Sequence, residues 1–252
     1  MDLLTQWQSG HELYRAGLIG ISVFGLSACL MLLFISAPYG RHHRAGWGPS
    51  VRARTGWVVM EAPSFIGFMA CSLVLGLSGV GAWIGGLFAA HYLYRAFVFP
   101  FRMRGGDKPK PWLTVGLAFA FNSVNGAVNA YDLQRAESFS LSAVVCGVVL
   151  FALGVFINHQ SDAILLRLRQ PGETGYSIPY GGLYRWVSAP NYLGEIIQWT
   201  GFAIAAATPA AWVFALFTVA NLAPRARSHH QWYLDRFSDY PRDRKRLVPG
   251  LW

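Results

Sequence analysis

The run SLSAVVCGVVLFALGVFINHQ, residues 140–160, contains no Asp, Glu, Lys or Arg side chain. A helix needs about 20 mainly apolar residues to cross the hydrocarbon core of a bilayer, so this run predicts a membrane-spanning helix. The composition agrees, because 54% of the 252 residues are hydrophobic and only 13% are charged. Soluble domains carry roughly 25% charged residues. The length and composition of such apolar runs therefore predict a fold of membrane-spanning helices.

Further apolar segments lie on both sides of this run, and the last two are joined tightly at Thr208-Pro209, so they could form one helical hairpin. No basic region leads into a short apolar stretch at the N-terminus, so we expect the first segment to stay as a membrane helix and not to be cleaved. The sequence predicts an all-α integral membrane protein, one domain over residues 1–252 with a cytoplasmic tail over 224–252. Its seven predicted spans are residues 16–36, 57–78, 81–99, 112–131, 140–160, 191–206 and 208–223.

The positive charges give this topology a direction. Most of the 21 Lys and Arg residues lie in the loops before the second, fourth and sixth spans and in the tail. The opposite side holds only Arg15 and Arg135, and Arg95 lies inside the third span. The positive-inside rule then places the N-terminus outside and the C-terminus in the cytoplasm. A bacterial inner membrane and an endoplasmic reticulum would show the same asymmetry.

The net charge of +9 comes mainly from arginine. Two explanations stay open at this point: contact with anionic lipid headgroups, and recognition of a phosphate-bearing ligand by the guanidinium fork. Nucleic acid is not an expected partner, because no soluble domain remains to present a basic face. No obligate protein partner is evident either.

Polar side chains occur near the predicted cytoplasmic ends of several spans, where their burial is costly. Taken singly, Glu61 could be a structural partner of Arg95, and the asparagines could join neighbouring helices. Residues four apart share a helix face, however, and such pairs recur at one depth on separate helices. This coincidence predicts one polar cavity that opens to the cytoplasm. Its expected members are Glu61, Tyr92, Arg95, Asn158, Asp162, Asn191, Glu195, Arg225, His229 and Tyr233.

The usual local motifs for metals and nucleotides are missing. No HExxH and no local two-His-one-carboxylate cluster occurs, so we predict no metal site. Gly79-Val80-Gly81 lacks the third glycine of a dinucleotide fingerprint and follows no predicted strand. A bound nucleotide would therefore need a fold other than the common soluble ones.

Several segments together resemble the steroid 5-alpha-reductases. They are WVVMEAPSF (57–65), HYLYRAFVF (91–99), the run 157–199 with NYLGE at 191–195, and the tail 225–252. The similarity extends from about residue 36 to the end. It implies a seven-helix membrane enzyme that uses NADPH to reduce the 4,5 double bond of a 3-oxo-4-ene steroid, with hydride transfer to carbon 5. Two positions depart from the family pattern: Met60 stands where glutamine is frequent, and Gly106 where a basic residue is expected.

The resemblance also implies roles for single residues. Glu61 and Tyr92 resemble the pair that hydrogen-bonds the substrate 3-oxo group, and the predicted substrate walls come from the first four spans. A steroid or steroid-like lipid and membrane lipids are the expected partners. The residues that resemble the cofactor-binding set are Tyr39, Arg104, Asn158, Asp162, Arg169, Tyr176, Asn191, Glu195, Arg225, His229 and Tyr233.

Three other functions stay open from the sequence. An enoyl-CoA or sterol double-bond reductase of the same wider family would share the cofactor half. An isoprenylcysteine-type membrane methyltransferase would have a similar C-terminal layout with S-adenosylmethionine. A small transporter is disfavoured, because the polar residues lie toward the cytoplasm and not near the midplane.

Overall fold

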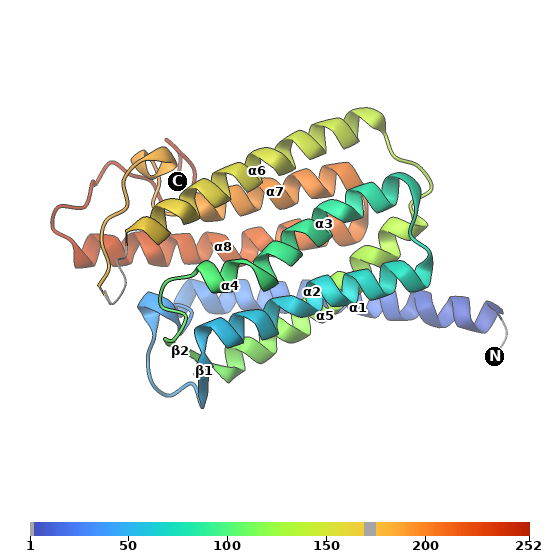
Figure 1. The fold of residues 1–252 in the computed structure, drawn as a ribbon, viewed down its shortest axis with the longest axis horizontal. Coiled ribbons are helices and arrows are strands. Elements are labelled where there is room, and N and C mark those ends of the chain that lie inside the picture. The colour runs from blue at the N-terminus through green and yellow to red at the C-terminus, as the bar shows by residue number, and fades with distance from the viewer. Residues whose placement is uncertain (1–2, 169–174) are drawn as a thin grey trace.

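The structure is a computed structural model that describes residues 3–168 and 175–252, so the predicted cofactor residue Arg169 lies outside it. Each predicted span corresponds to a long helix, and these helices run roughly along the long axis of the molecule (Figure 1). The long helices are α1 (Leu3–Phe34), α2 (Ala53–Leu75), α3 (Gly79–Phe97), α5 (Trp112–Arg135), α6 (Leu141–Arg167), α7 (Pro190–Ala206) and α8 (Pro209–Arg236). Short helical turns are α4 (Phe99–Arg102), η1 (Gly40–His42) and η2 (Gly182–Arg185).

Three helical segments among the described residues are long and apolar enough to cross a membrane by themselves: Gly10–Phe34, Ala53–Leu75 and Leu141–Arg167. The helix α7 has only 17 residues, which is near the lower limit for a span. Large apolar side chains such as Phe34, Val74 and Trp83 remain exposed on the outside of the bundle. The chain is thus a mainly helical protein with helices compatible with a membrane location.

The helices often extend beyond the predicted spans. The helix α6 continues to Arg167 and α8 to Arg236, several residues past their apolar segments. The reason is that an apolar run marks the part suited to lipid, whereas backbone hydrogen bonding continues into polar sequence. These extensions carry polar residues of the predicted cavity on regular helix.

The break between α7 and α8 occurs at the predicted place. Ala207 adopts a left-handed conformation, with φ of 52°, and ends α7. The side-chain oxygen of Thr208 accepts a hydrogen bond from the backbone N–H of Ala211 at 3.4 Å, which caps the start of α8. Asp132 on α5 accepts another from the N–H of Ala210 at 2.8 Å. The two helices therefore form a tight hairpin anchored to α5.

A small antiparallel sheet, which the sequence did not predict, lies at one end of the bundle. The C-terminal tail lies at the same end (Figure 1). Strand β1 (Ser50–Arg52) precedes α2, and strand β2 (Pro109–Pro111) precedes α5, with Val51 opposite Lys110. Strands of three residues with prolines in one of them carry almost no alternation signal. The pairing joins the loop before α2 to the loop before α5, a contact that the sequence did not predict.

An aromatic core lies between α3, α7 and α8. The ring of Phe88 on α3 stacks on Tyr92 with centroids 4.7 Å apart, and Trp199 on α7 lies 4.4 Å from Phe214 on α8. All four side chains are buried. This core ends at Tyr92, directly beneath the predicted polar layer.

Candidate active site at the basic end of the bundle

A cavity of about 310 Å³ lies among α1, α2, α5 and α8. Both predicted catalytic residues, Glu61 on α2 and Tyr92 on α3, line it. Three residues of the predicted cofactor set line it as well: Tyr39, Glu195 and Arg225. The structure thus brings together side chains from segments far apart in the sequence, as the predicted cavity requires.

The walls of this cavity are mostly apolar, but their origin differs from the prediction. Helices α1 and α5 contribute side chains such as Phe24 and Leu117, whereas α3 contributes only Tyr92. The helix α8, which the sequence assigned to the cofactor side, adds Phe214 and Phe217. The expectation of walls from the first four spans was therefore incomplete, because α8 packs against α1 and α5 and closes the cavity between them.

The aromatic core holds Tyr92 in place. Its ring packs against both Phe88 and Trp199, with centroids 4.7 and 5.7 Å away. Only 4% of the residue is exposed, so few rotamers are open to it. A fixed ring presents its hydroxyl to one point of the cavity, which is what a hydrogen bond to a rigid ligand needs.

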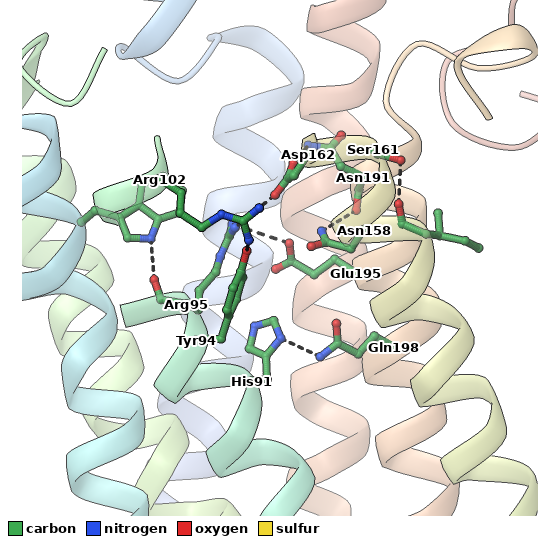
Figure 2. A network of polar contacts seen from close by, with 12 residues as sticks. His91, Tyr94, Arg95, Arg102, Asn158, Ser161, Asp162, Asn191, Glu195 and Gln198 are labelled. Atoms are coloured by element: carbon green, nitrogen blue, oxygen red, sulfur yellow. Dashed lines mark hydrogen bonds and ion pairs between the residues drawn. The ribbon is translucent and has the colours of Figure 1, made fainter. Parts of the chain in front are cut away.

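Arg95 joins the cavity side of the bundle to α6 and α7. Figure 2 shows its guanidinium reaching from α3 toward two carboxylates, with Nη1 3.8 Å from Asp162 Oδ2 and Nη2 3.8 Å from Glu195 Oε2. The same guanidinium lies 4.6 Å from the Trp57 ring centroid. The ion pairs that the structure gives Arg95 among the described residues are with these two carboxylates, and Glu61 interacts electrostatically with Arg95 at longer range.

Two asparagines continue this network across α6 and α7 (Figure 2). Asn158 donates to the backbone carbonyl of Asn191 at 3.0 Å, and the Asn191 amide donates to Asp162 Oδ1 at 3.2 Å. Asp162 thus accepts from one neighbour and pairs with another. Spacing predicted that each i,i+4 pair shares one face of its helix. In the structure these faces meet through Asn191, which contacts both Asn158 and Asp162.

A second cavity of about 160 Å³ lies at the same end of the bundle. Four predicted cofactor residues line it: Arg104, Asp162, Tyr176 and Tyr233. Because Asp162 and Glu195 share Arg95, the network of Figure 2 connects this cavity to the larger one. Apart from His229, and Arg169 outside the described residues, the predicted cofactor set therefore divides over two neighbouring cavities and the polar network between them.

His229 lies between aromatic rings on the inner face of α8. Its ring is 5.4 Å from that of His42 and 5.3 Å from that of Tyr192. Burial lowers the pKa of His42 to about 4, and the charges of Arg41 and Arg44 act in the same direction. A neutral His42 is the form that this stack favours.

Sequence reasoning missed Arg41, His42 and Lys110 as members of the site. Arg41 lines the second cavity, and its guanidinium lies 4.7 Å from the Tyr233 ring centroid and 5.4 Å from that of Tyr176. The available signal was local: Arg41 and His42 lie two and three residues after Tyr39, which was predicted to contact the cofactor. Position within a loop gave no depth, so Arg41 and Lys110 were counted only for the topology.

Comparisons with known proteins were consistent with this geometry. Residues 108–252 match the model of the family described as 3-oxo-5-alpha-steroid 4-dehydrogenase. The 3-oxo-5-alpha-steroid 4-dehydrogenase 1 of Bos taurus is 38% identical, over 90% of this chain and 92% of the relative. That of Mus musculus is 42% identical, over 87% and 89%. Steroid 5-alpha-reductase DET2 of Arabidopsis thaliana is 35% identical, over 95% and 97%.

Proposed function

Because the chain belongs to the 3-oxo-5-alpha-steroid 4-dehydrogenase family, we propose that it reduces the 4,5 double bond of 3-oxo-4-ene steroids with NADPH. The observation that carries the proposal is the shared cavity, in which Glu61 and Tyr92 line a mainly apolar space. A steroid is a rigid apolar body, and its 3-oxo group matches these two polar side chains. The product would be the 5-alpha-3-oxosteroid.

We place this enzyme in the membrane as seven spans with the C-terminus in the cytoplasm. The alternation of seven long helices supports this arrangement, since the loops before α2, α5 and α7 and the tail then share one end with their arginines. An apolar cavity bordered by α1 and α5 suits a substrate that enters from the bilayer. The two cavities described above would lie near the cytoplasmic surface, where NADPH is available.

The residues present fit a phosphate-bearing cofactor. Arg41 Nη1, His42 Nε2 and Arg225 Nε are buried and have no hydrogen-bond partner among the described residues. Buried donors without partners are costly, so a ligand with many acceptor oxygens would satisfy them. Arg41, Arg104, Tyr176 and Tyr233 would hold the phosphate-bearing part of NADPH, and Asn191, Glu195 and Arg225 the part near the substrate. Bound NADPH would supply the hydride that carbon 5 receives.

The protein's part in the chemistry is to stabilise charge on the substrate oxygen. Hydride addition at carbon 5 moves negative charge onto the 3-oxo oxygen, and protonation of carbon 4 then restores the ketone. Tyr92 donates a hydrogen bond to this oxygen, and Glu61 donates a second one when its carboxyl is protonated. A positioned donor of this kind commonly lowers a barrier by about 3 kcal/mol.

Two conservative substitutions test these roles. We expect Tyr92→Phe and Glu61→Gln to fold and to bind NADPH, but to reduce testosterone or progesterone at least ~100-fold more slowly. Tyr131→Phe is the matched control, because Tyr131 stacks on Tyr14 away from the cavity. A wild-type rate in either active-site variant would remove that residue from the proposed chemistry.

The cofactor assignment is tested separately by binding. Asn191→Ala and Arg225→Ala should raise the dissociation constant for NADPH, because each removes a donor at the junction of the two cavities. NADPH, but not S-adenosylmethionine, should raise the melting temperature of the wild-type protein. Unchanged NADPH affinity in both variants would show that the nucleotide binds elsewhere.

A further inference from the structure

Lys110 is a buried cation whose position is set by the small sheet. It lies in β2 opposite Val51 of β1, and only 3% of the residue is exposed. Its aliphatic stem passes Gly56 on α2, where an added Cβ would lie 3.5 Å from Lys110 Cδ. The side chain is thus directed inward from the end of the bundle, past a residue that leaves room for it.

The ammonium group of Lys110 has poor partners for a charged donor. Its Nζ lies 3.0 Å from the thioether sulfur of Met60, 4.7 Å from the Tyr39 ring centroid and 4.8 Å from that of Trp57. Among the described residues, no carboxylate oxygen lies within ion-pairing distance of it. A thioether is a weak acceptor, and a buried charge without a strong acceptor is costly. The group is therefore built for a partner that comes from outside the chain.

The space that Lys110 faces is the larger cavity. It lines this cavity together with Met60, Glu61 and Tyr92, and Arg225 is the other cation there. Burial lowers the pKa of Lys110 to about 7, while the charge of Glu61 opposes that shift and the charges of Arg225 and Arg95 add to it. The charge of Glu61 therefore favours the ammonium form of Lys110 in this cavity.

We propose that Lys110 is a third substrate-contacting residue, whose ammonium donates a hydrogen bond to the 3-oxo oxygen beside Glu61 and Tyr92. This inference rests on the proposed function. The carbonyl oxygen is the acceptor that the ammonium lacks, and Glu61, Tyr92 and Lys110 line the same cavity. No proton needs to leave Lys110: hydride adds to carbon 5, negative charge develops on the oxygen, and the ammonium stabilises that charge. Proton delivery to carbon 4 is a separate step.

A charge-removing variant of full-length protein tests the proposal. Lys110→Met keeps the stem and removes the ammonium, and we expect kcat/KM for progesterone to fall by ~100-fold with the NADPH dissociation constant within twofold of wild type. Lys110→Gln, which keeps a neutral donor, should fall between Lys110→Met and wild type. The matched control is Arg52→Met, which removes an exposed cation from the neighbouring strand and should keep the wild-type rate.

A binding measurement distinguishes substrate contact from a structural role. In the presence of NADP⁺, wild-type protein should bind a 3-oxo-4-ene steroid more tightly than its 3-deoxy analogue, and Lys110→Met should lose at least tenfold of that preference. Retention of the full preference, or a wild-type kcat/KM, in both Lys110 variants would overturn the inference. If wild-type protein neither binds nor reduces any 3-oxo-4-ene steroid, the proposed function itself fails. The two failures are thus separable.

Discussion

Helices α6 and α7 meet through backbone, whereas α1 meets its neighbours through side chains. An added Cβ at Gly147 of α6 would lie 2.5 Å from the Gly201 carbonyl oxygen of α7, and at Gly194 of α7 it would lie 2.5 Å from the Asn158 nitrogen of α6. On α1, an added Cβ at Gly25 would instead meet the Phe217 ring at 2.9 Å. Ring atoms can shift by rotation about side-chain bonds, and backbone atoms in packed helices cannot.

This difference separates a rigid unit from an adaptable one. The helices α6 and α7 carry Asn158, Asp162 and Asn191, whose mutual hydrogen bonds need a fixed spacing. The helix α7 also carries Glu195, which pairs with Arg95. The cavity walls from α1 and α5 are larger apolar side chains, which tolerate exchange and rearrangement more readily. We infer that the fold holds the polar network rigidly and leaves the apolar wall to vary with the ligand. The following variants challenge that contrast.

The largest effect should come from filling a backbone contact between α6 and α7. A Cβ at Gly154 would collide with the backbone of Gln198 and Gly194, so Gly154→Leu should remove more than about 5 kcal/mol of stability and leave little folded protein. Gly25→Leu should cost no more than about 2 kcal/mol, because Phe217 can move. Yield of monodisperse protein and melting temperature in detergent measure both. Equal losses would abolish the proposed distinction.

A smaller loss of stability should follow when the ion pairs that join α3 to α6 and α7 are removed. Arg95→Met leaves Asp162 and Glu195 buried without their shared cation, which should cost about 3 kcal/mol. The exposed Arg15 provides the control substitution, Arg15→Met, with little expected change. Adding Glu195→Gln to Arg95→Met should recover part of the melting temperature, since one unpaired charge is then gone. A melting temperature that Arg95→Met does not change would show that the ion pairs contribute nothing measurable.

The features that could be predicted from the sequence are those that depend on a single helix. An apolar run predicted each of the seven long helices in the described residues, because the length and composition of a segment can be read without its neighbours. Spacing also predicted that Asn158 and Asp162 share one helix face and that Asn191 and Glu195 share another, since four residues make about one helical turn. Those predictions depend on one helix at a time. The structure places both faces in one network around Arg95.

Features that depend on two loops or on precise packing were not predictable in this way. The pairing of β1 with β2 joins segments nearly sixty residues apart, and only this pairing turns Lys110 inward. The role of α8 in the cavity wall depends on how it packs against α1 and α5. The glycines of α6 and α7 recur at intervals of seven residues, at 147 and 154 and at 194 and 201. That pattern was a usable signal for close packing.

A moderate effect on NADPH binding is expected from Arg41, which lines the second cavity together with Asp162 of α6. Its Nη1 is buried without a hydrogen-bond partner among the described residues, so Arg41→Met should weaken NADPH binding about tenfold, equivalent to about 1.4 kcal/mol. Arg44→Met is the nearby control, because Arg44 is exposed and bonds the Ser36 carbonyl oxygen at 3.0 Å. Fluorescence titration with NADPH measures both. Equal weakening by the two variants would indicate a general effect of loop charge.

The smallest expected effect is a pH dependence of stability from His42, which stacks on His229 at the edge of the rigid unit. Its pKa is lowered to about 4 by burial and by Arg41 and Arg44, while an unfolded histidine has a pKa of about 6.5. The unfolded chain therefore binds more protons between these values, so His42's contribution is present above about pH 6.5 and is lost progressively toward pH 4. Because His42 is half-buried, the change should stay below about 1 kcal/mol. Melting temperatures from pH 7 to pH 5 should fall less for His42→Gln than for wild type, and parallel curves would show that the His42–His229 stack does not couple to protonation.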